Sequence, residues 1–279
     1  MAGVNIAGQR PIGVFDSGLG GLSVLADIII ERPDDQYLYY ADTHYAPYGE
    51  KSSEMVRKRV LEVADQLMNA GTRLLVIACN TATSAAADAI RSKASIPVVG
   101  MEPALKPAVE GDMRQTILVA ATPLTLQEKK FTNLMDQWRG SHQVLLLPCP
   151  GLVEVIEQEG PDALAVDEKL KTLVAPYECQ DIHRLVLGCT HYVLIRHKWQ
   201  QLMGAQVQLI DGNQGTLRQV VRLLKDDETP GEPCVTLVTS SKHVETLKRM
   251  KQILIQQLTL RGLTKDYIRK HIKIVTKEE

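Results

Sequence analysis

Two stretches of the chain, LVIACNT at residues 75–81 and LVLGCT at residues 185–190, decide the fold because they repeat one pattern. Each is a short run of β-branched and aliphatic residues that ends on a cysteine with a threonine close behind it. The two cysteines lie 110 residues apart. A fainter repeat relates GVFDS at residues 13–17 to LVAAT at residues 118–122. We therefore expect two similar halves, each presenting one cysteine at the end of a strand.

Short runs rich in β-branched residues alternate along the chain with longer segments whose apolar residues recur every three or four positions. The longer segments, such as 52–70, 125–139 and 163–177, have helical periodicity. Strands separated by helices indicate βαβ units and parallel sheets. The expected strands cover residues 11–15, 36–40, 73–78, 98–100, 116–120, 143–147, 185–187, 206–210 and 234–238.

The fold class that these patterns predict is α/β, with two pseudo-symmetric domains that have mainly parallel sheets. The first domain would comprise residues 1–99 and 212–279, including helices at the C-terminus, and the second residues 100–211. Ligands of such sheets bind beyond the carboxyl ends of the strands. We therefore expect the active site in the cleft between the domains, built from residues that directly follow strands.

The composition of the 279-residue chain argues against several classes of partner. An aromatic share of 4% is too low for a platform that stacks bases or sugars, and a net charge of −1 creates no field for nucleic acid or an anionic membrane. No stretch approaches the roughly 20 apolar residues of a membrane helix. Residues 242–279 are locally basic, which is typical of a solvated helix face, with a polyanion contact as the alternative. We expect no nucleic-acid partner and no membrane partner.

The cysteines and the N-terminus indicate the compartment. Residues 1–10 lack the apolar core and the small-residue cleavage pattern of a signal peptide. Five scattered cysteines do not form the framework of a secreted disulfide-rich domain. A reducing, cytoplasmic location is therefore expected. Cys149, Cys179 and Cys234 lack the repeated context and receive no role.

Cys79 and Cys189, at the two expected strand ends, suit the inversion of a carbon stereocentre. This reaction needs a base on one face of the carbon and an acid on the other, and two thiols can exchange those roles. The pKa of a free cysteine is about 8.5, and helix N-termini lower it. Both cysteines precede an expected helix start, where unpaired N–H groups favour a thiolate and a bound carboxylate. Buried apolar filler is the alternative for each.

Polar neighbours can help each thiol to exchange its proton. His191 lies two residues after Cys189, and Asp16, at the end of the first expected strand, can serve Cys79. The three glycines within residues 16–21 allow backbone N–H groups to approach an anion closely. Neutral donors for carboxylate and ammonium groups are Ser17, Asn80, Thr81 and Thr190.

Four motifs together resemble the glutamate racemase family. They are DSGLGGL at residues 16–22, ADT at 41–43 with PYG at 47–49, ACNTAT at 78–83 and GCTH at 188–191. They follow the order of the family and span most of the chain. The resemblance implies a cofactor-independent isomerase that interconverts L- and D-glutamate and supplies D-glutamate for bacterial peptidoglycan. It also implies a glutamate substrate, no metal and a possible homodimer.

The resemblance also assigns roles to individual residues. It implies that Cys79 acts on D-glutamate and Cys189 on L-glutamate, with assistance from Asp16 and His191. Glu157 matches an acid of the family at the edge of the site. The residues implied to hold the carboxylates and the amino group of the substrate are Ser17, Tyr48, Gly49, Asn80, Thr81, Thr125 and Thr190.

Several alternatives stay open at this point. Cys79, Cys189 and His191 could form a three-ligand zinc site, but no Cys-x-x-Cys pair accompanies them. Pyridoxal phosphate would need a Schiff-base lysine, and no lysine falls in a strand-end motif. Aspartate racemases typically have His where this chain has Thr83, which favours glutamate as substrate. A binding module for a dicarboxylate would need no matched thiols. Asp42 fits a site role or a turn equally well.

Overall fold

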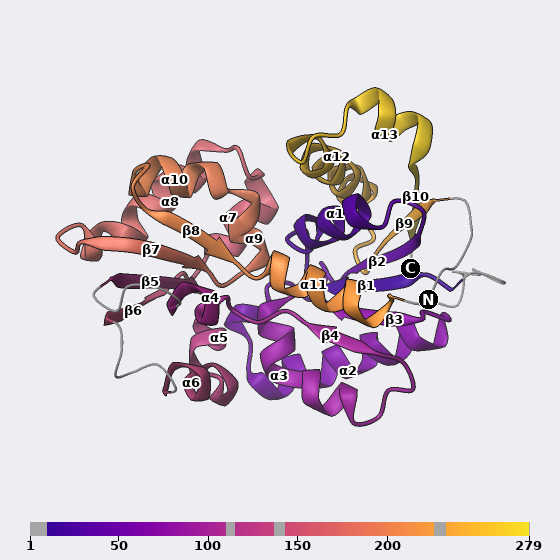
Figure 1. Cartoon of the computed structure of the whole chain (residues 1–279), viewed down its shortest axis with the longest axis horizontal. Coiled ribbons are helices and arrows are strands. Elements are labelled where there is room, and N and C mark those ends of the chain that lie inside the picture. Colours follow the sequence, from indigo (N-terminus) through magenta and orange to yellow (C-terminus); the bar gives the residue numbers. More distant parts are fainter. Residues whose placement is uncertain (1–9, 110–114, 137–142, 226–232, 279) are drawn as a thin grey trace.

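The strands form two separate sheets, and every strand pair in them is parallel (Figure 1). The computed structural model describes residues 10–109, 115–136, 143–225 and 233–278. The large sheet has six strands in the order β10-β9-β2-β1-β3-β4, and the small sheet has four in the order β6-β5-β7-β8. We call each sheet with its helices the large lobe and the small lobe. The α/β class with parallel sheets is therefore confirmed.

The two sheets share one strand order. The large sheet contains β1 (Ile12–Asp16), β2 (Gln36–Ala41), β3 (Leu74–Ile77), β4 (Val98–Gly100), β9 (Cys234–Thr239) and β10 (Lys273–Glu278). The small sheet contains β5 (Thr116–Ala121), β6 (Gln143–Pro148), β7 (Ile182–Leu187) and β8 (Gln208–Asp211). The order β2-β1-β3-β4 corresponds to β6-β5-β7-β8, strand for strand. The repeat in the sequence thus corresponds to a repeat in topology, with β3 equivalent to β7.

Helices cover both faces of the large sheet (Figure 1). Along β1 the buried side chains alternate, so that Ile12 and Val14 pack with α1 and α12 while Phe15 packs with α2 and α3. Strands buried on both faces read as continuous apolar runs, as this one does. The helices of the large lobe are α1 (Leu22–Glu31), η1 (Tyr48–Glu50), α2 (Ser53–Asn69), α3 (Asn80–Arg91), α11 (Asn213–Leu223), α12 (Val244–Leu260) and α13 (Lys265–His271).

The helices of the small lobe are shorter on average. They are α4 (Leu105–Val109), α5 (Pro123–Gln127), α6 (Lys129–Asp136), α7 (Leu152–Glu159), α8 (Leu164–Val174), η2 (Ala175–Tyr177), α9 (Thr190–Leu194) and α10 (Arg196–Met203). Among the described helices of both lobes, none has the length and apolar character that crossing a bilayer requires.

The predicted helix at 52–70 is confirmed as α2. Its buried residues Val56, Val60, Val63 and Leu67 recur every three or four positions, and the side chain of Ser52 accepts a hydrogen bond from the backbone N–H of Met55. This serine satisfies one of the N–H groups that the first turn of a helix leaves unpaired.

Two predicted helical stretches need correction. The stretch 125–139 is not one helix, because Glu128 has an extended backbone that separates α5 from α6, and residues 137–139 lie outside the described residues. At the C-terminus the expected helices are present as α12 and α13, but the chain does not finish in them, because β10 follows α13 and pairs with β9. The lysines of β10 conceal its strand character, and charged residues are typical of an edge strand.

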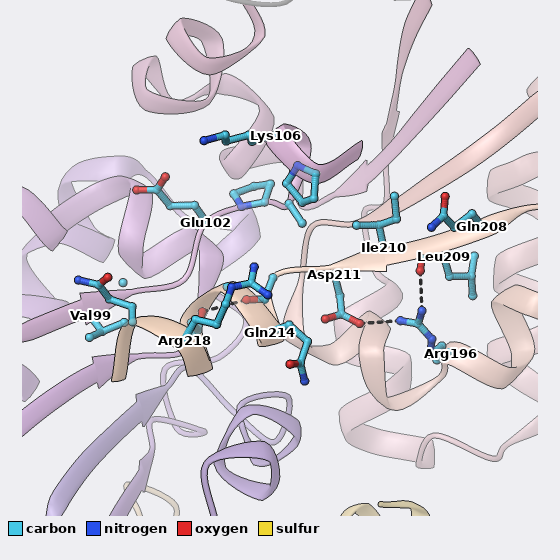
Figure 2. Close-up of a pocket in the computed structure, with 18 of the residues that line it drawn as sticks. Val99, Glu102, Lys106, Arg196, Gln208, Leu209, Ile210, Asp211, Gln214 and Arg218 are labelled. Carbon is cyan, nitrogen blue, oxygen red and sulfur yellow. Dashed lines mark hydrogen bonds and ion pairs between the residues drawn. The ribbon is translucent and has the colours of Figure 1, made fainter. Parts of the chain in front are cut away.

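The chain passes between the lobes twice, and the two passages lie side by side (Figure 2). A Cβ atom added to Gly212 would lie 2.7 Å from the backbone oxygen of Glu102, so the second passage runs against the first. A cavity of about 800 Å³ opens beside them, where Arg196 donates to Asp211 over 2.5 Å. The domain limits given above stay a prediction.

Candidate active site

Equivalent strands carry the two cysteines. Cys79 follows β3 and is the N-cap of α3, and Cys189 follows β7 and is the N-cap of α9. The expectation that each cysteine stands between a strand and a helix is confirmed. Since the lobes share one topology, the two thiols occupy corresponding places in them.

The residues that surround the two cysteines meet at the contact between the lobes. Asp16 Oδ2 accepts a hydrogen bond from Thr190 Oγ1 over 3.0 Å, and the neighbouring Ser17 Oγ lies 3.6 Å from Cys79 Sγ. Asp16 and Ser17 belong to the large lobe, whereas Thr190 directly follows Cys189 in the small lobe. These contacts join the surroundings of one thiol to those of the other.

Burial determines the protonation of Cys79. It raises the pKa of this thiol to about 12, with additional contributions from the charges of Asp16 and Cys189. The backbone N–H of Ala82, 3.4 Å from the sulfur, acts in the opposite direction, as expected at a helix N-terminus. The expected shift of the Cys79 pKa toward the thiolate is therefore not found, because the loss of hydration outweighs the hydrogen bonds with Ala82 and Ser17.

His191 lies between Cys189 and Glu157. Its Nδ1 atom is 3.8 Å from Cys189 Sγ, and its Nε2 atom is 2.6 Å from Glu157 Oε1. Burial alone would lower the pKa of His191, but its hydrogen bonds with Cys189 and Glu157 raise the pKa well above that of an exposed histidine. The arrangement therefore holds a positive charge beside the Cys189 sulfur.

Asp16 acts on Cys79 through its charge. Its Oδ1 atom accepts a hydrogen bond of 2.7 Å from the backbone of Gly18, and its Oδ2 atom accepts the one from Thr190. Burial raises the pKa of Asp16. The Cys79 sulfur itself contacts the hydroxyl of Ser17 and the backbone N–H of Ala82, and not Asp16.

The glycine loop that follows β1 packs against the small lobe. A Cβ atom added to Gly18 would lie 2.1 Å from Glu157 Oε1, and one added to Gly20 would lie 2.5 Å from the backbone nitrogen of His191. Between them, the backbone N–H of Leu19 donates to Glu157 Oε1 over 2.7 Å. Glycine here allows the close approach of the opposite lobe.

Three threonine hydroxyls form a triangle across the lobes. The Oγ1 atom of Thr81, in α3, lies 3.0 Å from the Oγ1 atoms of both Thr122 and Thr125, and these two atoms are 2.9 Å apart. Beside them, Asn80 Oδ1 is buried and has no hydrogen-bonding partner among the described residues. An acceptor in this state can bind an added donor such as an ammonium group.

Asp42 holds the segment that carries Tyr48. The hydroxyl of Tyr48 donates to Asp42 Oδ2 over 2.5 Å, and Arg59 of α2 donates to both oxygens of the same carboxylate over 2.8 and 2.7 Å. Asp42 is fully buried. Gly49 follows Tyr48 and contacts Thr122 of the small lobe. Asp42 is therefore more than a turn residue, since it orders one edge of the site.

Comparison with known proteins identifies the family. Residues 25–244 match the family described as Asp/Glu/Hydantoin racemase. A protein of Clostridium perfringens named "Glutamate racemase" is 44% identical over 225 residues, which are 80% of this chain and 86% of that protein. This chain belongs to the Asp/Glu/Hydantoin racemase family.

Solved structures of glutamate racemases have the same fold as this racemase. The Escherichia coli enzyme, in complex with L-glutamate and the activator UDP-MurNAc-ala, matches with a TM-score of 0.80 and 26% identity, covering 96% of this chain and 98% of that one. The enzyme of Francisella tularensis, in complex with D-glutamate, matches with a TM-score of 0.78 and 25% identity, covering 96% and 97%.

The structure places the predicted site residues of this racemase around one contact between the lobes, and their roles in catalysis stay predictions. Within the described parts of the chain, no three His, Cys, Asp or Glu side chains form a group that could hold a metal ion. The sequence reasoning did not include Thr122 as a site residue and missed Arg59. The spacing of Thr122 and Thr125, three residues apart after a strand, is a signal that could have identified Thr122, whereas no local pattern distinguishes Arg59 from the other basic residues of α2.

Proposed function

We propose that this protein is a cofactor-independent glutamate racemase that moves a proton on and off Cα of glutamate with Cys79 and Cys189. The observation that supports the proposal is that these cysteines follow equivalent strands of the two lobes and that their neighbours Ser17, Asp16 and Thr190 form one contact between the lobes. The glutamate racemases to which the chain is similar support glutamate as the substrate.

In the direction from L- to D-glutamate, the Cys189 thiolate takes the proton from Cα. The Cys79 thiol then gives its own proton to the opposite face of the carbon, which inverts the stereocentre. One C–H bond breaks, another forms, and the two thiols exchange protonation states. From D- to L-glutamate, Cys79 is the base and Cys189 the acid. Such a pair works best when each pKa is near the working pH.

The surroundings of the thiols fit these roles. The imidazole of His191 lies beside the Cys189 sulfur, where it can exchange a proton with the thiol, and Glu157 fixes the imidazole ring. Ser17 and Asp16 would assist proton exchange at Cys79, whose raised pKa suits the acid in this first direction.

Substrate binding would use the polar groups around the lobe contact. The unpartnered Oδ1 atom of Asn80 can accept from the ammonium group. The threonine hydroxyls and the N-terminus of α3 can donate to a carboxylate once the threonine triangle opens. The residues proposed to bind substrate are Ser17, Tyr48, Gly49, Asn80, Thr81, Thr125, Thr190 and Glu157.

The cellular role follows from the activity. D-Glutamate is consumed in building bacterial peptidoglycan, so the racemase would serve cell-wall biogenesis and cell shape. We place it in the cytoplasm as a possible homodimer.

Removing either thiol tests the mechanism. We expect Cys79→Ala and Cys189→Ala each to lower kcat by at least about 10³-fold, because each removes one proton-transfer group. Replacement by serine should also be severe, since a hydroxyl is far less acidic than a thiol. Cys179→Ala is the control, because this cysteine is exposed and has no proposed role. Circular dichroism of both glutamate isomers in metal-chelated buffer follows the rate.

Deuterium uptake separates the racemase from a dicarboxylate-binding module. Both isomers are incubated with the protein in heavy water, and mass spectrometry follows label at Cα. If calorimetry detects glutamate binding but no deuterium enters Cα, the proposal is contradicted. Racemisation by a variant that lacks both thiols would also contradict it. Equal rates on aspartate and glutamate would contradict the assignment of substrate alone.

A further inference from the structure

Helix α7 of the small lobe is held at both ends by charged side chains of the large lobe. At its start, Glu50 Oε1 accepts a hydrogen bond of 2.7 Å from the backbone N–H of Gly151. At its end, Arg249 Nη1 donates to the backbone oxygens of Glu157 and Gln158, the latter over 3.1 Å. Arg249 belongs to α12, more than 90 residues away in sequence.

Both contacts match the polarity of the helix. The first N–H groups and last carbonyl groups of a helix have no partners within it, and they give its start a partial positive charge and its end a partial negative charge. An acid at the start and a cation at the end are therefore the stabilising arrangement. The Nη1 atom of Arg249 donates hydrogen bonds to two of these last carbonyl groups, those of Glu157 and Gln158.

The end of α7 is also where the helix reaches the proposed catalytic machinery. The backbone oxygen of Glu157 binds Arg249, while its carboxylate binds Nε2 of His191 and the N–H of Leu19. The His191 side chain is only 2% exposed, so this carboxylate is not readily replaced by water. A single residue thus connects Arg249 to the imidazole beside Cys189.

We propose that Arg249 is a positioning residue, which fixes the last turn of α7 from the large lobe and thereby holds the Glu157 carboxylate against His191. The inference rests on the proposed function, because it assigns Arg249 to the racemase mechanism. A merely structural Arg249 would hold the lobes together without affecting the imidazole.

The main test is Arg249→Met, with Lys248→Met as the matched control. Lys248 is the preceding residue of α12, is exposed, and pairs with Glu245 of its own helix. We expect Arg249→Met to lower kcat roughly tenfold with KM changed less than twofold, and Arg249→Lys to restore part of the rate. Lys248→Met should behave as the wild type.

The titration of His191, followed by NMR of the imidazole, distinguishes positioning from a simple effect of charge. Removing a nearby cation would by itself raise the pKa of His191. Loosening Glu157 instead removes a partner that stabilises the charged ring and lowers the pKa. The imidazole also forms a hydrogen bond with Cys189 and interacts electrostatically with Asp16 and Glu154. These three residues are unchanged in the variant. We expect the pKa to fall in Arg249→Met.

A double-mutant cycle with Glu157→Gln completes the test. If Arg249 acts through the Glu157 carboxylate, Arg249→Met should change kcat less than twofold once that carboxylate is absent. An equal loss in both backgrounds, or an unchanged or raised pKa of His191, would overturn the proposal. The titration needs no turnover, so it decides the role of Arg249 even if the wild type fails to racemise glutamate. In that case only the proposed function is lost.

Discussion

Gly20 is a single residue on which the contact between the lobes depends. A Cβ atom at this position would lie 2.5 Å from both the backbone nitrogen of His191 and Thr190 Oγ1. Backbone cannot rotate away as the end of a flexible side chain can, so the lobes would have to separate. Gly18 faces a side-chain oxygen of Glu157 instead of backbone.

We expect Gly20→Ala to lower the free energy of unfolding by about 1–3 kcal/mol, the usual cost of overpacking, and to reduce kcat as His191 shifts. Urea unfolding and racemase assays measure the two effects. Gly215→Ala is the control, because Gly215 lies in α11 with open space around it and alanine favours a helix by roughly 1 kcal/mol. Equal stabilities of the two variants would contradict this account of the contact.

At the scale of elements, the carboxylate of Asp42 joins three of them. It follows β2, accepts from Tyr48 of η1, and pairs with Arg59 of α2. Burial raises the pKa of Tyr48, so its hydroxyl stays protonated and continues to donate. The hydrogen bonds with Asp42 outweigh the loss of hydration and raise the pKa of Arg59, which keeps its charge.

Arg59→Met should destabilise the fold by about 3–5 kcal/mol, because it leaves the buried Asp42 carboxylate without its cation. Arg57→Met, an exposed position of the same helix, is the control and should change stability by less than about 0.5 kcal/mol. Urea unfolding gives both values. In the Asp42→Asn background the effect of Arg59→Met should shrink, and an undiminished effect would show that the guanidinium acts through other contacts.

Two features of the helices and strands could not be predicted from residue patterns along the chain. The predicted strands and α2 are present, since apolar periodicity reports directly on buried faces. β10 was missed because an edge strand needs few apolar residues. The break at Glu128 was also missed. Helix α5 begins at Pro123, with Thr122 as its N-cap, before the predicted segment, and the apolar pattern contains no signal for the end of this short helix.

For the molecule as a whole, the stability should depend on the charge of His191. Its pKa is higher in the folded protein than the value of about 6.5 in the unfolded chain, so the folded state binds more protons between these values. The contribution is fully present below a pH of about 6.5 and is lost as the pH rises through the folded pKa.

The free energy of unfolding should therefore fall in the wild type as the pH rises above about 6.5, and it should fall less in His191→Gln. Urea unfolding at several pH values measures it. The comparison of the two proteins isolates the histidine, because the raised pKa values of Asp16, Glu154 and Cys79 belong to groups that both proteins contain. Parallel curves for the two proteins would contradict the prediction.

The chain pattern alone specifies the α/β class, the repeat of two halves, and the strand ends that carry Cys79 and Cys189. These features are local, because periodicity and strand-end motifs act over a few residues. The roles of Glu157, Thr122 and Arg249 at the lobe contact depend on the tertiary structure. Their partners lie 34 to 138 residues away. The packing within the small lobe sets the distance between Glu157 and His191, and the packing of one lobe on the other sets the rest.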